Sequence, residues 1–239
     1  MPLSTQEIKP TFDQTGFVII PNLFSREEAM QMKTEMQRII AEVREAAMQA
    51  GQSPESILPS GVYVGLAARS EFYRRLVADQ RLLEVLTLLI GPQVEFLSDK
   101  AVFKNDRTTF SSPWHQDWPY WQGDHKISVW IALDDVTPEN GCLKLLPGSH
   151  QQVAIHDGDA SDGFGFAHRL APEALDESRA ATAALEAGGA AFFHDLTLHA
   201  SYPNTTGRDR WVWIPTYRDA VNDDPPYSWA VAARIVSGG

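Results

Sequence analysis

The sequence predicts an α+β fold that is mainly β and is built as a sandwich or a barrel. Two amphipathic helical patterns fall within residues 1–92, and after Pro92 the sequence changes to short apolar segments separated by turns. Helices followed by a run of strands are typical of α+β domains. A chain of 239 residues with 44% hydrophobic and 21% charged residues fits a single soluble globular domain, residues 1–239.

The N-terminal region, residues 1–92, is predicted to begin with a strand and a long helix. Residues 16–20 are apolar and match a short strand. The spacing of Ser25 and Glu28 matches a capping box, which predicts a helix from there to about Gly51. Its buried stripe is expected to comprise Ala29, Met30, Met32, Met36, Ile39, Ile40, Val43 and Ala47.

A loop and a second helical region complete the N-terminal part. Residues 51–65 include Pro54, Pro59 and Gly61, and this composition predicts a loop. The second helical region is expected to run from about residue 70 to residue 90, where a Gly-Pro pair ends it.

The C-terminal region, residues 93–239, is predicted to form the β core. Its strands are expected near residues 93–104, 112–118, 126–134, 141–146, 189–194, 197–202, 210–218 and 228–236. The segment 155–187 is rich in Gly, Asp and Ala, and loops of this length are uncommon unless they are functional or flexible. We interpret 155–187 as a lid beside an active site, with a plain surface insertion as the alternative.

The composition argues against several classes of function. The net charge of −11 and the isoelectric point near 5.0 disfavour nucleic acid and anionic membranes as partners. The single cysteine, Cys142, is expected to be a core residue, and it suits a reducing cytoplasm because no internal disulfide can form. The N-terminal sequence has no secretory signal pattern, and the longest apolar stretch, residues 82–90, is too short to span a bilayer.

The tripeptide His115-Gln116-Asp117 is the first candidate for metal chemistry. Residues i and i+2 of a strand project to the same side, so the imidazole of His115 and the carboxylate of Asp117 are expected to converge. One further histidine would complete a 2-His-1-carboxylate triad, which leaves coordination positions open as non-heme iron oxygenases require. Taken alone, the tripeptide also fits a capped loop with a surface histidine.

A second segment contributes a candidate third ligand and a candidate anion site. His194 and His199 lie five residues apart, so one strand cannot present both to the same point. Arg210 opens the apolar run 210–214, where a buried guanidinium requires an anionic partner such as a carboxylate. The hydroxyl of Ser201 is placed to share that anion.

These residues belong to a longer set of motifs that resembles the phytanoyl-CoA dioxygenase family of Fe(II)- and 2-oxoglutarate-dependent oxygenases. The motifs cover residues 95–218 in the family's order: Trp114-His115-Gln116-Asp117, Trp130, Pro138-Glu139-Asn140-Gly141-Cys142-Leu143, Leu146-Pro147-Gly148-Ser149-His150, Phe193-His194, His199-Ala200-Ser201, Asn204 and Arg210. The resemblance implies a double-stranded β-helix, which is a jelly-roll or cupin-like barrel, with the N-terminal helices packed on one sheet.

The resemblance also implies roles for individual residues. His115, Asp117 and His199 match the Fe(II) ligands, and Arg210 with Ser201 matches the site of the 2-oxoglutarate 5-carboxylate. Trp130 matches a position that lines the co-substrate, with an ordinary core tryptophan as the alternative. Other residues are expected to be structural or solvated: His150 in a turn, His125, His156 and His168 in polar loops, and Arg208 in a surface turn.

Lys100 and Lys104 lie four residues apart and therefore on one face of a strand. Lys100 matches a position near the metal-bound end of the co-substrate, but it also fits a contact with an anionic group of the substrate or a solvated lysine. Lys104 is a candidate for the substrate pocket. The nearby aromatic residues are candidates for its apolar wall, or for core positions: Phe110, Trp114, Trp118, Tyr120 and Trp121.

The implied reaction is hydroxylation of a C–H bond in a small-molecule metabolite with O2, releasing succinate and CO2. Halogenating relatives have a small residue at the Asp117 position, so the carboxylate favours hydroxylation. Two alternatives stay open: a cupin-like metalloenzyme that does not use 2-oxoglutarate, and a non-catalytic binding protein on the same fold. The oligomeric state is not readable from the sequence.

Overall fold

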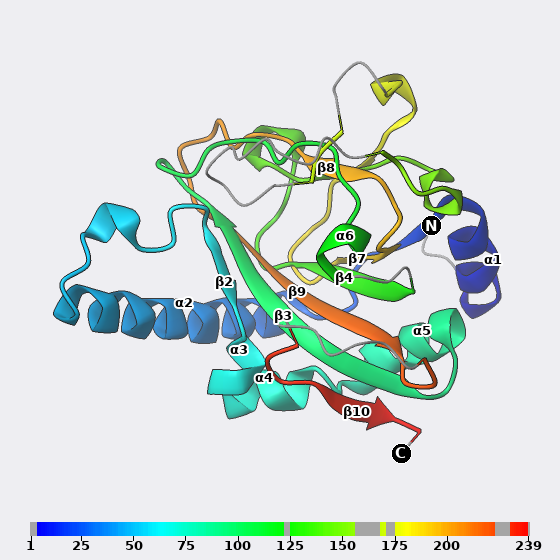
Figure 1. Cartoon of the computed structure of the whole chain (residues 1–239), viewed down its shortest axis with the longest axis horizontal. Coiled ribbons are helices and arrows are strands. Elements are labelled where there is room, and N and C mark those ends of the chain that lie inside the picture. The colour runs from blue at the N-terminus through cyan, green and yellow to red at the C-terminus, as the bar shows by residue number, and fades with distance from the viewer. Residues whose placement is uncertain (1–3, 122–124, 156–167, 171–174, 223–229, 239) are drawn as a thin grey trace.

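The computed structural model describes residues 4–121, 125–155, 168–170, 175–222 and 230–238 (Figure 1). The N-terminal part contains α1 (Thr5–Thr15), β1 (Phe17–Ile20), α2 (Arg26–Gln49), η1 (Pro54–Ser56), β2 (Val62–Val64), α3 (Leu66–Arg69), α4 (Glu71–Leu76) and α5 (Gln80–Ile90). The remaining elements are β3 (Val94–Lys104), α6 (Trp118–Trp121), β4 (Lys126–Ala132), η2 (Pro138–Asn140), β5 (Leu143–Leu145), η3 (Ser149–Gln151), η5 (Glu177–Arg179), β6 (Ala181–Ala183), β7 (Ala190–His194), β8 (His199–Ser201), β9 (Arg210–Asp219) and β10 (Arg234–Ser237).

Two antiparallel sheets form the predicted jelly-roll. The larger sheet has the order β1-β7-β4-β9-β3-β10, with β2 also paired to β3, and the smaller sheet has the order β6-β5-β8. A cluster of apolar side chains that includes Trp130, Leu143 and Ile214 joins the two sheets. Strand neighbours that are distant in the sequence, such as β1 beside β7, are what a jelly-roll requires, and the predicted fold class is confirmed.

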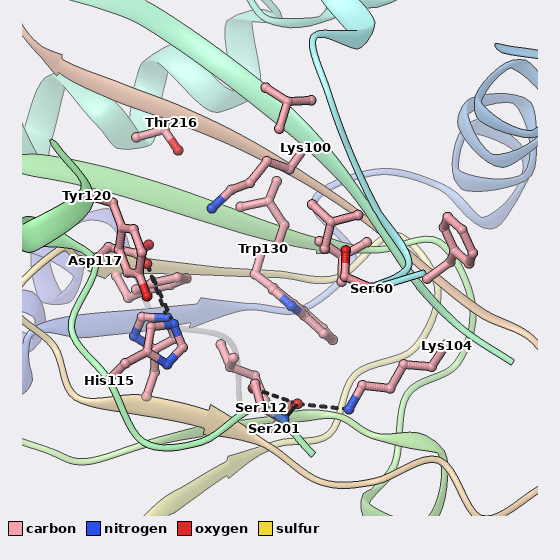
Figure 2. Close-up of a pocket in the computed structure, with 18 of the residues that line it drawn as sticks. Ser60, Lys100, Lys104, Ser112, His115, Asp117, Tyr120, Trp130, Ser201 and Thr216 are labelled. Atoms are coloured by element: carbon pink, nitrogen blue, oxygen red, sulfur yellow. Dashed lines mark hydrogen bonds and ion pairs between the residues drawn. The ribbon is translucent and has the colours of Figure 1, made fainter. Parts of the chain in front are cut away.

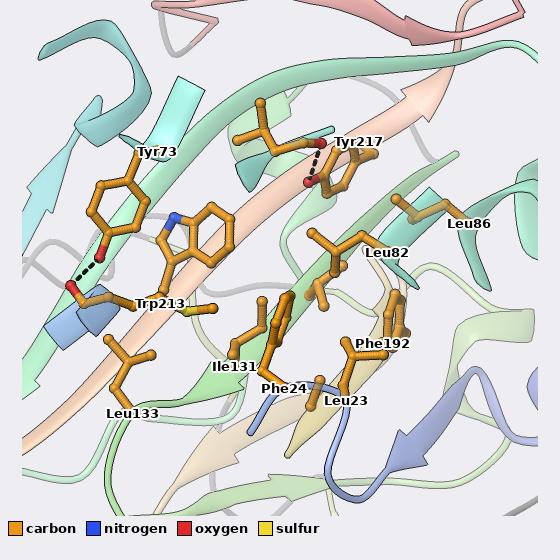
Figure 3. Packing of buried hydrophobic residues seen from close by; sticks show 14 of the residues in the cluster. Leu23, Phe24, Tyr73, Leu82, Leu86, Ile131, Leu133, Phe192, Trp213 and Tyr217 are labelled. Carbon is orange, nitrogen blue, oxygen red and sulfur yellow. Dashed lines mark hydrogen bonds between the residues drawn. The ribbon is translucent and has the colours of Figure 1, made fainter. Parts of the chain in front are cut away.

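The N-terminal helices cover the other face of the larger sheet, as predicted (Figure 1). Side chains of β9 alternate between the two faces, so Trp211, Trp213 and Tyr217 point toward the helices. Tyr73 of α4 lies 5.2 Å from the Trp213 ring, centre to centre, and donates a hydrogen bond to the carbonyl of Met32 in α2 (Figure 3). This packing ties the sheet and the helices into one apolar core.

The long helix α2 begins and ends close to the predicted residues. The Ser25 hydroxyl accepts a hydrogen bond from the amide of Glu28, and the Glu28 carboxylate accepts one from the amide of Ser25, which is the predicted capping box. The stripe is buried at Ala29, Met32 and Met36. Met30 is 61% exposed, so its assignment to the stripe is wrong, because it lies about a quarter turn away from Ala29.

The predicted helical region over residues 70–90 is confirmed, but it is divided, because residues 77–79 separate α4 from α5. Asp79 caps the new helix by accepting a hydrogen bond from the amide of Arg81. The predicted loop over 51–65 contains η1 and the short strand β2. The last strand lies at Arg234–Ser237 rather than over 228–236, of which residues 228–229 lie outside the described residues.

The segment 112–118 is not the predicted strand. Only His115 pairs there, through an isolated bridge to His199, and Trp118 already begins α6. Pro113 lacks an amide hydrogen and cannot continue a ladder of hydrogen bonds. In the predicted lid, residues 156–167 and 171–174 lie outside the described residues, and the described remainder includes β6, which pairs with β5 and is therefore not loop.

Across the described part of the chain, every helix is too short or too polar to cross a membrane.

Asp99 of β3 is a buried carboxyl group between the sheet and the helices. Its two oxygens accept hydrogen bonds from the indole of Trp213 (3.0 Å) and the amide of Ala67 (3.2 Å). Burial is the dominant effect on this group and raises the pKa of Asp99 to about 6.

Replacing Asp99 by Asn should remove a pH dependence of stability. The pKa of about 6 in the fold lies above the ordinary value of 3.8, so stability linked to the neutral carboxyl is present below about pH 4 and is lost as pH rises through 6. Urea unfolding should show the wild type losing about 2 kcal/mol relative to D99N between pH 4 and pH 7. A constant difference between the two proteins over this range would contradict the assignment.

Candidate active site

His115, Asp117 and His199 converge at one end of a cavity between the sheets (Figure 2). The Nε2 atoms of the two histidines each lie 3.7 Å from Oδ1 of Asp117, and the three candidate ligand atoms all lie within 4.8 Å of one another. All three side chains are buried. The predicted convergence is therefore confirmed, although Asp117 reaches the site from outside a strand.

Backbone hydrogen bonds hold this cluster together. The amides of His115 and His199 each donate to the other residue's carbonyl at 3.0 Å, and the amide of Asp117 donates to the carbonyl of Asp195 at 2.8 Å. Nδ1 of His115 lies 2.8 Å from the carbonyl of Pro113, and Nδ1 of His199 lies 2.9 Å from that of Thr197. A carbonyl can only accept, so Nδ1 carries the proton and Nε2 presents its lone pair to the cavity, as a metal ligand must.

The electrostatics keep both imidazoles neutral and the carboxylate charged. Burial lowers the pKa of His115 to about 3 and lowers the pKa of His199. Burial alone would raise the pKa of Asp117, but neighbouring groups, first of all the Lys100 ammonium, outweigh it and hold that pKa below its ordinary value. Two neutral imidazoles and one carboxylate form a donor set suited to a divalent transition metal.

The cavity has a volume of about 370 Å³ and extends from this cluster to Arg210. Its described lining includes eight polar or charged side chains beyond the three candidate ligands, and six aromatic ones. The polar group comprises Ser60, Ser98, Lys100, Lys104, Ser112, Ser201, Arg210 and Thr216, and the aromatic group comprises Phe103, Phe110, Tyr120, Trp121, Trp130 and Phe193.

Arg210 and Lys104 form a pair of buried cations at the far end. They are direct neighbours in the β3–β9 register and both line the cavity. Nη2 of Arg210 donates to the carbonyl of Gly141 at 2.9 Å, but Nη1 is buried and has no acceptor among the described residues. Nζ of Lys104 donates to the Ser201 hydroxyl at 2.8 Å and to the carbonyl of Tyr202 at 2.5 Å. Like charges opposite each other repel, so this end is built to receive an anion.

Trp130 lines the cavity as predicted, and the Arg210 guanidinium lies 5.6 Å from the centre of its ring. Lys100 also lines the cavity, with its ammonium directed toward the metal end, whereas Lys104 lies beside Ser201 (Figure 2). Lys100 therefore lies at the metal end, as expected, whereas Lys104 lies at the Arg210 end.

Of the five aromatic candidates, three line the cavity: Phe110, Tyr120 and Trp121. The prediction is wrong for Trp118, whose indole donates to the side-chain oxygen of Gln116 outside the described lining. Trp114 takes the alternative that was left open, a core position, because it packs with Leu198 in a separate apolar cluster. The error at Trp118 follows from treating 112–118 as one strand, because α6 already begins at that residue.

The other titratable residues lie outside the described cavity lining. Nδ1 of His194 accepts a hydrogen bond from the amide of Leu196, and Nε2 of His150 lies 3.2 Å from the carbonyl of Asp13. His125 and His168 do not contribute to the lining, and His156 lies outside the described residues. Arg208 is exposed, as predicted. Cys142 is the predicted core residue, and burial raises the pKa of its thiol to about 11.

Four hydroxyl residues of the cavity lining, Ser60, Ser98, Ser112 and Thr216, were not predicted, and neither was Ser128, which neighbours Thr216 outside the described lining. Ser112 donates from both its amide and its hydroxyl to the Ser201 hydroxyl, at 3.0 and 2.7 Å. Ser98, Ser128 and Thr216 lie side by side on β3, β4 and β9, and the Ser128 hydroxyl donates to Asp117 at 3.4 Å. Hydroxyls in strands are common, and only the register between strands places these beside the charged groups.

Comparisons with known proteins agree on one family. The family model "Phytanoyl-CoA dioxygenase (PhyH)" matches residues 12–212. L-proline trans-4-hydroxylase of Streptomyces griseoviridis is 26% identical over 90% of this chain and 87% of its own length. Ectoine dioxygenase of Stutzerimonas stutzeri is 28% identical over 61% of this chain, which spans only half of that relative.

Solved structures share the fold. The apo form of EctD from S. alaskensis has a TM-score of 0.75 at 22% identity, covering 96% of this chain and 84% of its own. The 2-oxoglutarate complex of EvdO2 from Micromonospora carbonacea var. aurantiaca has a TM-score of 0.72 at 22% identity, covering 96% of this chain and 97% of its own.

Replacing His199 by Ala should weaken binding of a divalent transition metal by at least about 100-fold, since even changes behind a metal ligand lower affinity by about 10- to 100-fold. Anaerobic calorimetric titration with Fe(II) measures the change. The matched control is H194A, which removes a histidine outside the described cavity lining and should leave the affinity within about threefold. Equal losses in both variants would show that the cluster is not the metal site.

Proposed function

The chain belongs to the phytanoyl-CoA dioxygenase family of non-heme iron, 2-oxoglutarate-dependent oxygenases, and we propose that it hydroxylates a C–H bond of a small-molecule metabolite. One observation carries the proposal. A neutral pair of histidines with a carboxylate, and a buried cation pair that includes the unbonded Nη1 of Arg210, face each other across one cavity. A cavity with a metal site at one end and a cationic site at the other suits a keto-diacid.

We assign the Fe(II) to Nε2 of His115, Nε2 of His199 and the carboxylate of Asp117. Their donor set fits the metal because both Nε2 lone pairs face the cavity and the carboxylate stays charged. Bound Fe(II), with O2 and 2-oxoglutarate, supplies the oxidising power for hydroxylation, and succinate and CO2 leave as by-products. The Ser128 hydroxyl orients Asp117 from behind.

We assign the 5-carboxylate of 2-oxoglutarate to Arg210, Ser201 and Lys104. Nη1 of Arg210 supplies a donor that no described residue uses, and Lys104 supplies a second positive charge. This revises the expected role of Lys104 from substrate contact to co-substrate contact. Trp130 forms the apolar wall between the two ends, where it excludes water from the co-substrate.

The two rival functions fit the same cavity less well. A cupin-like enzyme without 2-oxoglutarate leaves the opposed Lys104 and Arg210 without an anion. A non-catalytic binding protein does not require both Nδ1 atoms to be held by carbonyls. Assays of succinate release and of substrate oxidation, each with and without 2-oxoglutarate, separate these functions. Substrate oxidation without 2-oxoglutarate would exclude our assignment.

We also propose that residues 1–239 act as one domain. Ile8, Met36 and Trp213 share one core, so the N-terminal helices and the sheet are packed together. We propose that the reaction takes place in the cytoplasm, because a chain with one cysteine cannot form an internal disulfide and therefore suits a reducing compartment.

Replacing Arg210 by Met should raise the concentration of 2-oxoglutarate needed for half-maximal succinate formation by about 100-fold, because it removes the charged donor of the 5-carboxylate. Fe(II) affinity should change by less than about threefold. The matched control is R208M, which removes an exposed arginine two residues away and should leave both values unchanged. A loss of iron binding with an unchanged 2-oxoglutarate requirement would contradict the clamp.

The affinity for 2-oxoglutarate should fall as pH rises above about 7. Burial, and then the charge of Arg210, lower the pKa of Lys104 to about 7, and Cys142 is the other titratable group that acts on it. A bound carboxylate favours the charged amine, so binding above that pKa takes up a proton and weakens about tenfold per pH unit. K104R stays charged and should abolish this slope in titrations between pH 7 and pH 9. An unchanged slope in K104R would contradict the assignment.

A further inference from the structure

We propose that the prime substrate carries an anionic group, such as a carboxylate, that binds to Lys100 beside the metal end of the cavity. The inference deepens the proposed function and rests on it, because it assumes that the co-substrate occupies Lys104 and Arg210. It names the chemical class of the substrate, a small organic acid, rather than one compound.

The charge of the cavity is the first argument. In a chain of net charge −11, the described lining holds three permanent or potential cations, Lys100, Lys104 and Arg210, and only one carboxylate, Asp117. A divalent metal and a dianionic co-substrate add charges that cancel. A positive surplus therefore remains after both are bound, and an uncompensated charge in an enclosed site favours a further anion.

The position of Lys100 is the second argument. It faces the cavity from the middle of β3, and its ammonium points toward Asp117 and Tyr120 (Figure 2). No hydrogen-bond acceptor or ion-pair partner contacts it among the described residues. Lys104 donates hydrogen bonds to a hydroxyl and a carbonyl, so the two lysines differ in their hydrogen bonding. A half-buried ammonium that acts on Asp117 through its charge but makes no hydrogen bond with the described residues is available to a ligand.

The surroundings of Lys100 supply further donors. Ser98 lies two residues earlier on the same face of β3, lines the cavity, and has a buried hydroxyl without a hydrogen-bond partner in the described part of the chain. Thr216, its neighbour on β9, lines the cavity beside it. A small anion beside Lys100 would satisfy the Ser98 hydroxyl, whose burial without a partner is otherwise unfavourable.

The size of the cavity limits what the anion is attached to. About 370 Å³ must hold both the co-substrate and the reacting part of the substrate. Tyr120 and Trp121 of α6 line the cavity, Tyr120 beside Asp117 (Figure 2), and offer apolar surface to a compact carbon skeleton. These features favour a small acid whose carboxylate pairs with Lys100 while its C–H bond faces the metal.

The test measures anion binding without turnover. Protein loaded with Zn(II) and saturated with 2-oxoglutarate is titrated with benzoate and with its neutral, equally shaped partner benzamide, and with propionate and propionamide as a smaller pair. Saturation-transfer NMR measures each dissociation constant. We expect the carboxylates to bind at least tenfold more tightly than the amides in the wild type, and K100M to remove that preference while K100R retains most of it.

The controls separate this inference from the proposed function. K9M removes an exposed lysine on α1 that lies outside the described cavity lining, and it should leave the preference unchanged. The affinity for 2-oxoglutarate is measured first, and failure to bind it would overturn the proposed function. If 2-oxoglutarate binds normally but acids and amides bind alike, or K100M weakens 2-oxoglutarate rather than benzoate, the inference alone is overturned.

Discussion

The pair of backbone hydrogen bonds between His115 and His199 is the constraint on which the whole site depends. These bonds join two segments that are distant in the sequence, and they set both imidazoles beside each other with ring centres 4.1 Å apart. Asp117 follows because its amide is held by Asp195. The jelly-roll stabilises this geometry by placing the segment of His115 against β8, so that three ligands need no loop rearrangement to meet.

The polar and charged side chains of the cavity lie in a fixed order along two neighbouring strands of the larger sheet, β3 and β9. Rows of neighbouring residues on β3 and β9 run from Ser98 and Thr216, past Lys100 and Ile214, to Lys104 and Arg210. The polar rows lie at the two ends and the apolar side chains of Trp130 and Ile214 lie between them. This order gives an acidic protein a cavity with cationic side chains, where we propose that the co-substrate binds at Lys104 and Arg210 and an anionic substrate group binds at Lys100.

The sequence carried the main features of the site but not their spatial order. The motif spacing identified His115, Asp117, His199 and Arg210, because each belongs to a short segment of recognisable pattern. The position of Lys104 beside Arg210 could not be predicted, since it depends on the register of β3 against β9. The strand period also failed around Trp118, where Asp117 is followed directly by a helix.

For the fold too, some elements could be predicted from the sequence and others could not. Strands β3, β4, β7 and β9 were predicted well because they are long enough to show apolar runs, and the capping box located the start of α2. The break between α4 and α5 was missed because the apolar pattern continues across the turn at 77–79. Short strands such as β2 and β6 form because a neighbouring strand pairs with them. The local sequence does not identify that neighbouring strand, so these short strands could not be predicted.

The most direct measurement is a crystal structure of the protein grown without oxygen in the presence of Fe(II) and 2-oxoglutarate. The account predicts iron bound by Nε2 of His115, Nε2 of His199 and the carboxylate of Asp117, with the far carboxylate of the diacid between Nη1 of Arg210 and Nζ of Lys104. A metal bound elsewhere, or a diacid whose far carboxylate does not touch Arg210, would contradict it.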